Sequence, residues 1–137
     1  MKILVTGGTG YIGSHTVVEL QQQGHQVVIA DNLSNSREEV ADAIALVTSV
    51  RPEFVKIDLA EPAQTEAFFQ TCKEVDAVIH FAAFKAVGES VAQPLKYYRN
   101  NLLSLMNILR GMADHGIQHL VFSSSCTVYG TPDRLPV

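Results

Sequence analysis

A run of glycines close to the start of the chain is the stretch best suited to bind a ligand. In ILVTGGTGYIGSH, residues 3–15, an apolar segment leads into Gly7, Gly8, Gly10 and Gly13, and the last three satisfy G-x-G-x-x-G. Between a strand and a helix, such a turn brings main-chain amides and the positive end of the helix dipole to a pyrophosphate. A tight turn without any ligand is the alternative.

A carboxylate further along the chain strengthens the ligand hypothesis. Asp31 stands 18 residues after Gly13, at the end of the second predicted strand. At this place a carboxylate can accept hydrogen bonds from an adenosine ribose and repel a 2′-phosphate. Alone, Asp31 would be an ordinary strand-end residue. Together with the glycine turn it predicts a dinucleotide site that favours NAD over NADP.

The elements that must position these residues alternate along the chain. Short runs rich in Val and Ile predict buried strands at 2–6, 26–30, 54–57, 77–81 and 119–123. The longer segments between them predict helices at 12–23, 37–49, 62–71 and 94–115. This alternation predicts one α/β domain over residues 1–137, a Rossmann-type doubly wound parallel sheet with strand order 3-2-1-4-5.

Prolines and glycines mark the ends of the predicted helices. Pro62 and Pro94 suit the first turn of a helix, where the missing N–H is not needed. Gly24 and Gly116 fall just past helix ends, where a left-handed residue is favoured. His80 has apolar neighbours inside a predicted strand, so we expect a core histidine rather than a proton donor.

Composition and charge narrow the classes of protein. Hydrophobic residues make up 47% and charged residues 18% of 137 residues, as in a globular domain, and the net charge is −4. Without a basic cluster, neither nucleic acid nor an anionic membrane is an expected partner. Cys72 and Cys126 are isolated, and no apolar run approaches the ~20 residues of a membrane span. We therefore expect a cytoplasmic protein.

Four motifs in the sequence are typical of a known family. They occur in the order VTGGTGYIGSH, DNLSNS, HFAAFKAVGES and FSSSCTVYG. They resemble the corresponding motifs of the UDP-glucose 4-epimerases, which are extended short-chain dehydrogenases/reductases. The glycine motif is shared by the whole superfamily, whereas KAVGES and the serine run before TVYG are narrower. The resemblance extends over essentially the whole chain.

The resemblance implies a set of residues around bound NAD. The turn and the helix start would contact the pyrophosphate through Gly7, Gly10, Tyr11, Ile12 and Gly13. The adenosine ribose would be surrounded by Asp31, Asn32, Leu33, Asn35 and Ser36. Asp58 and Leu59 would border the adenine. The rest of the cofactor would lie along Phe81, Ala82, Ala83, Lys85 and Asn100. The alternatives are a solvated lysine at Lys85 and a helix-capping or bridging role for Asn100.

The resemblance also implies a reaction. Family members interconvert UDP-galactose and UDP-glucose through a 4-keto intermediate, a step of galactose metabolism. Ser125, the third serine of the run, would be the catalytic residue that hydrogen-bonds the 4-hydroxyl of the sugar, and Thr127 would lie beside the substrate. A homodimer is expected for the parent protein, and no metal site is expected.

One motif of the family is absent from these 137 residues. Family members carry Tyr-x-x-x-Lys, in which the tyrosine acts as base on the sugar hydroxyl and the lysine lowers the pKa of that tyrosine. No lysine stands four residues after Tyr11, Tyr97, Tyr98 or Tyr129. We therefore expect an N-terminal, NAD-binding part of an epimerase, truncated before the catalytic helix and the nucleotide-sugar domain and inactive on its own.

The last predicted helix and strand carry more apolar residues than one sheet face can cover. On the helix these are Leu102, Leu103, Leu105, Met106, Leu109 and Met112. The strand HLVFSS would normally have a neighbour on its outer edge. Exposed edges and apolar patches favour association, so we expect the chain to self-associate.

Two other kinds of function are compatible with the fold. A 4,6-dehydratase or a UDP-glucuronate decarboxylase would belong to the same superfamily, but a dehydratase is expected to carry acidic residues after the serine, where this chain has Cys126 and Thr127. A non-catalytic NAD-binding module is the other alternative. The presence of Ser125 and Thr127 on the sugar side argues against such a module.

Overall fold

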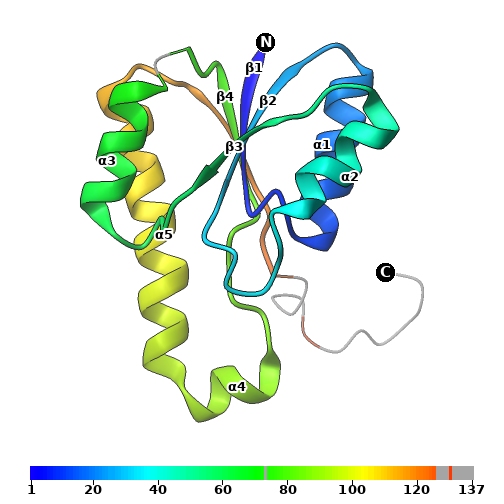
Figure 1. Cartoon of the computed structure of the whole chain (residues 1–137). Coiled ribbons are helices and arrows are strands. Elements are labelled where there is room, and N and C mark those ends of the chain that lie inside the picture. Colours follow the sequence, from blue (N-terminus) through cyan, green and yellow to red (C-terminus); the bar gives the residue numbers. More distant parts are fainter. Residues whose placement is uncertain (73, 126–129, 131–137) are drawn as a thin grey trace.

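The computed structural model describes residues 1–72, 74–125 and 130, in which helices cover both faces of one sheet (Figure 1). The sheet is built from five parallel strands, β1 (Lys2–Thr6), β2 (Gln26–Asp31), β3 (Glu53–Lys56), β4 (Ala77–His80) and β5 (His119–Phe122). The helices are α1 (Tyr11–Gln22), α2 (Glu39–Thr48), α3 (Pro62–Thr71), α4 (Val87–Ala92) and α5 (Pro94–Asp114). The strands lie in the order β3-β2-β1-β4-β5, which confirms the predicted topology.

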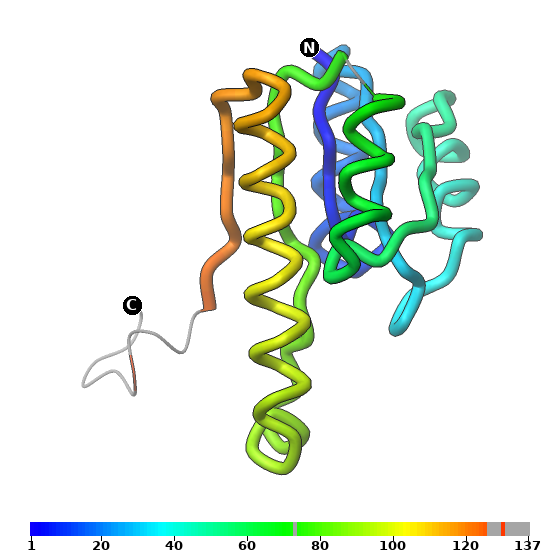
Figure 2. Tube along the Cα trace, turned by 90° about the vertical axis from the view of Figure 1, so that its left-hand side faces the viewer, coloured from blue at the N-terminus to red at the C-terminus, as the bar shows by residue number. Residues whose placement is uncertain are grey.

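The central strands are apolar on both faces because each face is covered by helices. Val5 of β1 belongs to a cluster with Val17 of α1 and Ile44 of α2. Its neighbour Leu4 points the other way and packs in a second cluster with Phe68 of α3. Figures 1 and 2 show α1 and α2 on one side of the sheet and α3 and α5 on the other. Full burial of each such aliphatic side chain stabilises the fold by roughly 1.5–3 kcal/mol.

Helix ends lie where the prolines and glycines predicted them. Pro62 and Pro94 occupy the first turns of α3 and α5. Gly24 and Gly116 follow α1 and α5 with φ angles of +82° and +71°, the left-handed conformation expected of them. These predictions are confirmed. The prolines mark where α3 and α5 begin, and the glycines mark where the chain leaves α1 and α5.

The short helix α4 was not predicted from the sequence. Its six residues, VGESVA, include no buried side chain, so they carry no periodic apolar pattern. Glu89 ties α4 to α5 instead, since its carboxylate accepts hydrogen bonds from Lys96 Nζ at 2.6 Å and Tyr97 Oη at 2.7 Å. Several predicted bounds also shift by one or two residues; for example, α2 begins at Glu39 rather than at residue 37, and β2 extends through Asp31.

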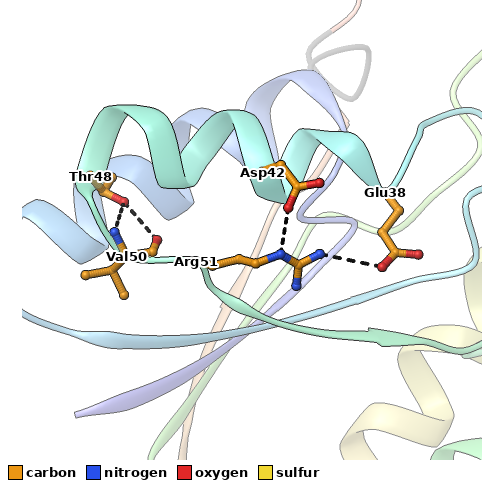
Figure 3. Close-up of polar contacts among 5 residues, drawn as sticks. All are labelled: Glu38, Asp42, Thr48, Val50 and Arg51. Carbon is orange, nitrogen blue, oxygen red and sulfur yellow. Dashed lines mark hydrogen bonds and ion pairs between the residues drawn. The ribbon is translucent and has the colours of Figure 1, made fainter.

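Arg51 fixes the connection between α2 and β3 (Figure 3). Its Nε lies 2.7 Å from Asp42 Oδ1, and its Nη2 lies 3.6 Å from Glu38 Oε1, so the guanidinium runs back along the helix. Thr48 Oγ1 accepts a hydrogen bond from the N–H of Val50 at 3.3 Å. The ion pairs are exposed to solvent, and they link the segment before β3 to the first turns of α2.

Helix α5 and strand β5 leave apolar side chains uncovered in the described structure. Leu102, Met106 and Leu109 on α5 are 52%, 61% and 45% exposed, and Val121 and Phe122 on β5 are 60% and 49% exposed. Figure 2 shows β5 at one edge of the sheet, and α4 with the first turns of α5 extends beyond the ends of the strands. The predicted excess of apolar surface is confirmed for these residues, whereas Met112 of the same predicted set is buried in the core.

Candidate functional site

The predicted site residues lie along one edge of the sheet, where the carboxyl ends of the parallel strands meet (Figure 1). The glycine turn follows β1, Asp31 ends β2, Asp58 follows β3, Phe81 follows β4, and Ser125 follows β5. Doubly wound sheets bind ligands at this edge, next to the point where the strand order reverses. In this chain the reversal lies between β1 and β4.

The glycine turn has a shape that excludes side chains. Gly7 has a φ angle of +68°, and its N–H donates to the carbonyl of Ala30 in β2 at 2.9 Å. A Cβ at Gly13 would lie 2.2 Å from the Gly7 carbonyl oxygen, so no larger residue fits there. The N-cap of α1 is Gly10, which offers no side chain to the first amides of the helix. Those amides have no acceptor within the helix and can hydrogen-bond an anionic group.

The Asp31 carboxylate is buried against this turn. Asp31 is only 7% exposed. Its Oδ2 accepts a hydrogen bond from the N–H of Thr9 at 3.3 Å. Oδ1 accepts from the N–H of Leu33 at 2.9 Å and from Ser36 Oγ at 3.3 Å. The structure therefore joins Asp31 and the glycine turn, which the sequence linked only by their spacing.

Thr9 is a residue that the sequence analysis missed. It is 4% exposed, and its Oγ1 lies 2.7 Å from Ser36 Oγ, so its side chain connects the glycine turn to the loop after β2. A threonine among glycines is typical of any turn, and nothing in the sequence indicates that it reaches a serine 27 positions away. The pattern T-G-G-x-G with a hydroxyl at x is the only signal that could have drawn attention to it.

The end of β4 lies directly beside Gly7. A Cβ on Gly7 would come within 2.8 Å of the nitrogen of Ala82, and Ala82 N–H donates to Thr6 Oγ1 at 3.4 Å. The same hydroxyl lies 2.8 Å from Nδ1 of His80. His80 is 2% exposed, and burial lowers its pKa to about 4, so its predicted place in the core is confirmed. The imidazole is therefore neutral at neutral pH.

Asn101, next to the predicted Asn100, holds the loop after β4. Its Oδ1 accepts the N–H of Phe84 at 2.8 Å, and its Nδ2 donates to the carbonyl of Phe84 at 3.0 Å. Asn100 is half-buried and donates from Nδ2 to Asn101 Oδ1 at 2.9 Å. The sequence contains both asparagines. Only the structure shows that the side chain of Asn101, rather than that of Asn100, hydrogen-bonds the main chain of the loop after β4.

Asp58 and Leu59 lie after β3, and their hydrogen bonds are local. Asp58 Oδ1 accepts the N–H of Ala60 at 3.0 Å, and the N–H of Asp58 donates to Gln64 Oε1 at 3.0 Å. The side chain of Leu59 is 4% exposed and belongs to the core. Its carbonyl accepts a hydrogen bond from Asn107 Nδ2 at 2.8 Å. Any contact of Leu59 with an adenine would therefore be made from its main chain.

Tyr11 and Ile12 stand at the start of α1 with exposed side chains. The ring of Tyr11 packs edge-on against His15, with 4.9 Å between centroids. A shallow pocket of about 420 Å³ follows this flank of α1 and includes both Tyr11 and Ile12. It runs along the helix surface toward Leu20 rather than over the strand ends, so we do not identify it with the dinucleotide site.

The other predicted cofactor residues occupy the two loops on either side of the glycine turn. In the first loop, Leu33 adopts a left-handed φ of +60°, and Asn32 Oδ1 accepts the N–H of Ser34 at 3.0 Å. Asn35 is exposed in the same loop. In the second loop, Ala83 and Lys85 are exposed on the strand-end side of α4. That these residues contact the cofactor remains a prediction.

The sugar-side residues lie at the end of β5. Ser123 donates its N–H to the carbonyl of His80 at 3.2 Å, which continues the pairing of β5 with β4. Ser125 is exposed two residues further on. Thr127 lies outside the described residues, as does Cys126. The structure therefore places Ser125 at the predicted edge of the sheet and leaves its role a prediction.

The part of the chain that the structure describes holds neither a cluster of metal-ligating side chains nor a helix that could span a membrane. Within residues 1–72, 74–125 and 130, no three His, Cys, Asp or Glu side chains gather where they could hold a metal ion. Over the same ranges, no helix combines the length and the apolar character needed to cross a bilayer.

Comparison with known proteins then defines the family. Residues 3–136 match the profile of the NAD dependent epimerase/dehydratase family. This chain belongs to that family. Its sequence is 49% identical over 137 residues to a UDP-glucose 4-epimerase of Bacillus subtilis (strain 168), covering all of this chain and 40% of that protein. It is 46% identical to a UDP-glucose 4-epimerase of Klebsiella pneumoniae over 99% of this chain and 97% of that one.

Solved structures agree with this assignment. A UDP-glucose-4-epimerase from Stenotrophomonas maltophila, with bound NAD and formylated UDP-arabinopyranose, superposes with a TM-score of 0.92 at 51% identity, over the whole chain and 40% of that protein. A UDP-glucose 4-epimerase from Bifidobacterium longum, in complex with NAD+ and UDP, gives a TM-score of 0.93 at 42% identity, over 41% of its length. The resemblance to the epimerases is confirmed, and the chain spans about 40% of the length of most of these relatives.

Proposed function

We propose that this chain is the NAD-binding part of a UDP-glucose 4-epimerase. The observation that carries the proposal is the hydrogen bond between the buried Asp31 carboxylate and the amide of Thr9 in the glycine turn, at 3.3 Å. It brings the two groups that recognise an adenosine ribose and a pyrophosphate into one site, in a chain of the NAD dependent epimerase/dehydratase family.

The glycine turn fits the pyrophosphate of a dinucleotide. The close approach of Gly13 to Gly7 and of Gly7 to Ala82 leaves main chain, without Cβ atoms, at the surface where phosphates would lie. The first amides of α1, from Tyr11 onward, supply hydrogen bonds and the positive end of the helix dipole. We infer that Gly7, Gly10, Tyr11, Ile12 and Gly13 hold this part of NAD.

Asp31 fits the adenosine ribose. A carboxylate offers about four acceptor positions, and the chain's own donors use three of them. The fourth, on Oδ2, remains for a ribose hydroxyl, and the negative charge opposes a 2′-phosphate. We propose that the loop after Asp31, with Asn32, Leu33, Asn35 and Ser36, encloses this ribose, and that Asp58 and Leu59 border the adenine.

The remaining predicted contacts lie toward the sugar. We propose that Phe81, Ala82, Ala83, Lys85 and Asn100 line the cofactor beyond β4. When bound, NAD would supply the redox chemistry, in which a hydride leaves C4 of the hexose and is later returned to it. Ser125 would hydrogen-bond the 4-hydroxyl there, and Thr127 would lie beside it. The Stenotrophomonas and Bifidobacterium structures, which hold NAD with a UDP-sugar and with UDP, support these ligand classes.

The substrates of the whole protein would be UDP-glucose and UDP-galactose, interconverted through a 4-keto sugar. We propose that the 137-residue polypeptide alone does not catalyse this reaction, because it contains no Tyr-x-x-x-Lys pair to act as general base. Such a base typically contributes about 10²–10⁴-fold to a rate. Turnover of UDP-galactose by the purified polypeptide would contradict this. The parent protein is proposed to be a cytoplasmic homodimer.

Calorimetric titration of the polypeptide with NAD and NADP tests the proposal. We expect NAD to bind more tightly than NADP. Asp31→Asn removes the charge that orients the ribose, so it should weaken NAD binding by about 10–100-fold and reduce the preference over NADP. Asp114→Asn, at the exposed end of α5, is the matched control and should change neither affinity. Failure of the unsubstituted chain to bind NAD, or equal binding by Asp31→Asn, would contradict the proposal.

A further inference from the structure

We propose that Thr9 is a positioning residue that acts through Ser36 on the Asp31 carboxylate and so helps to select a ribose with a free 2′-hydroxyl. The inference rests on the proposed function, because it deepens the role of the same site. Thr9 lies within the first family motif, but it is not among the cofactor contacts that the resemblance implies. Its proposed positioning role rests on one chain of hydrogen bonds and on its burial.

The direction of the hydrogen bonds in this chain can be worked out. Ser36 Oγ lies 3.3 Å from Asp31 Oδ1 and 2.7 Å from Thr9 Oγ1. A carboxylate can only accept, so the single proton of the Ser36 hydroxyl is directed at Asp31. The proton in the shorter contact must then come from Thr9. The order is therefore Thr9 to Ser36 to Asp31, and each hydroxyl strengthens the next bond toward the charge.

The hydroxyl chain closes a ring with the main chain of the glycine turn. The N–H of Thr9 donates to Asp31 Oδ2, while its hydroxyl reaches Oδ1 through Ser36. One residue thus contacts both carboxylate oxygens, directly and through a second residue, and this restrains rotation of the carboxylate. The N–H of Leu33, a residue in the left-handed conformation, also donates to Oδ1. The acceptor position left on Oδ2 consequently has a fixed direction.

Burial makes the arrangement sensitive to loss of the hydroxyl. Thr9 is 4% exposed and Asp31 7% exposed, so water cannot easily replace the missing donor. Thr9→Val keeps the branched shape and removes the hydroxyl, whereas Thr9→Ser keeps the hydroxyl and removes the methyl group. The two variants therefore separate hydrogen bonding from packing.

The experiment is calorimetric titration of the 137-residue chain with NAD and with the NAD analogue that lacks the 2′-hydroxyl of the adenosine ribose. For Thr9→Val we expect about three- to tenfold weaker binding of NAD. We expect a smaller loss for the 2′-deoxy analogue, so that the preference for NAD over the analogue falls. Thr9→Ser should retain both affinities and the preference. Thr71→Val, which removes a helix-surface hydroxyl on α3, is the control.

The split between the two ligands distinguishes positioning from a structural role. If Thr9→Val weakens both ligands equally, or neither, the inference is overturned. If Thr9→Val does not fold, as judged by circular dichroism, Thr9→Ala removes the same hydroxyl with a smaller side chain and should lower the preference for NAD. An unchanged preference in that variant also overturns the inference. If the unsubstituted chain binds no NAD, the proposed function fails and this inference falls with it.

Discussion

The carboxyl ends of β2 and β5 lie along the same edge of the sheet, but the chain treats them differently. At the end of β2, Asp31 is 7% exposed and both of its carboxylate oxygens accept hydrogen bonds from the chain. At the end of β5, Val121 and Phe122 are 60% and 49% exposed, and Ser125 is exposed as well. β2 has a strand on each side, whereas β5 is an edge of the described sheet.

The difference separates two halves of one proposed site. The adenosine half is organised by the glycine turn and the loop after β2. The sugar half presents the exposed apolar side chains of Val121 and Phe122. We infer that binding of a dinucleotide and chemistry on a sugar depend on different parts of the protein. The predictions below test the closed glycine turn, the buried core beside it and the exposed strand β5 in turn.

The largest effect is expected at the glycine turn. In Gly13→Ala, the new Cβ would meet the Gly7 carbonyl oxygen at 2.2 Å and the Gly8 Cα at 2.8 Å. Both are main-chain atoms that cannot move without opening the turn, so we expect the free energy of unfolding to fall by about 3 kcal/mol or more. Urea denaturation monitored by circular dichroism measures this loss.

Gly88 is the matched control for Gly13. It lies in the exposed helix α4, and a Cβ there would meet nothing within 4 Å. Gly88→Ala should leave stability unchanged or raise it by about 0.5–1 kcal/mol, because alanine favours the helix. Similar losses in the two variants would contradict the claim that main-chain contacts close the turn at Gly13.

His80 predicts a dependence of stability on pH. Burial lowers its pKa from 6.5 to about 4, so between these values the unfolded chain binds more protons than the folded chain. The free energy of unfolding should therefore rise as the pH increases from about 4 to 6.5, by up to about 3 kcal/mol. Above pH 6.5 this contribution is complete.

Denaturation of the chain and of His80→Asn across this pH range measures the effect. Carboxylates also titrate in acid, so the quantity of interest is the difference between the two chains. We expect the variant to be less stable at pH 7 and to show a smaller increase in stability between pH 4 and 6.5. Parallel curves for the two chains would contradict the assignment of His80 as the group responsible.

The smallest effect on stability, but a clear one on association, is expected at β5. Val121→Lys adds charge to an exposed edge strand, which opposes pairing between copies of the chain. Sedimentation velocity over a concentration series should detect self-association of the unsubstituted chain and less of it in the variant. Val47→Lys, at a 62% exposed position on α2, is the control and should associate like the unsubstituted chain. A monomer at all concentrations would contradict the prediction.

Most of the fold could be predicted because its elements carry strong local patterns. The strands are apolar runs, and Pro62, Pro94, Gly24 and Gly116 mark where helices begin or end. Helix α4 could not, because none of its side chains is buried and its contacts to α5 depend on Glu89 meeting residues of another helix. The start of α2 lies two residues later than predicted, and the first amides there donate to the carbonyls of Arg37 and Glu38.

The candidate site could be predicted only at positions where the residue type and its place in the sequence suggest a single chemical role. Asp31 could be found because a carboxylate at a strand end after a glycine turn has few other roles. Thr9 and Asn101 could not, because each depends on a partner that is distant in sequence, Ser36 and Phe84. The sequence holds the hydroxyl and the amide, but the fold decides which way they point.

The most direct test of the account is to map NAD on the isotope-labelled chain by the chemical shifts of its backbone amides. The account predicts that added NAD shifts the amides of Thr9 to Gly13 and of Asp31 to Ser36 most strongly, with smaller changes after β4. The amides at the opposite, amino ends of the strands, such as those of Lys2 and Gln26, should stay unchanged. Saturating NAD that leaves the glycine turn and the Asp31 loop unshifted, or shifts only the exposed surfaces of α5 and β5, would contradict the central claim.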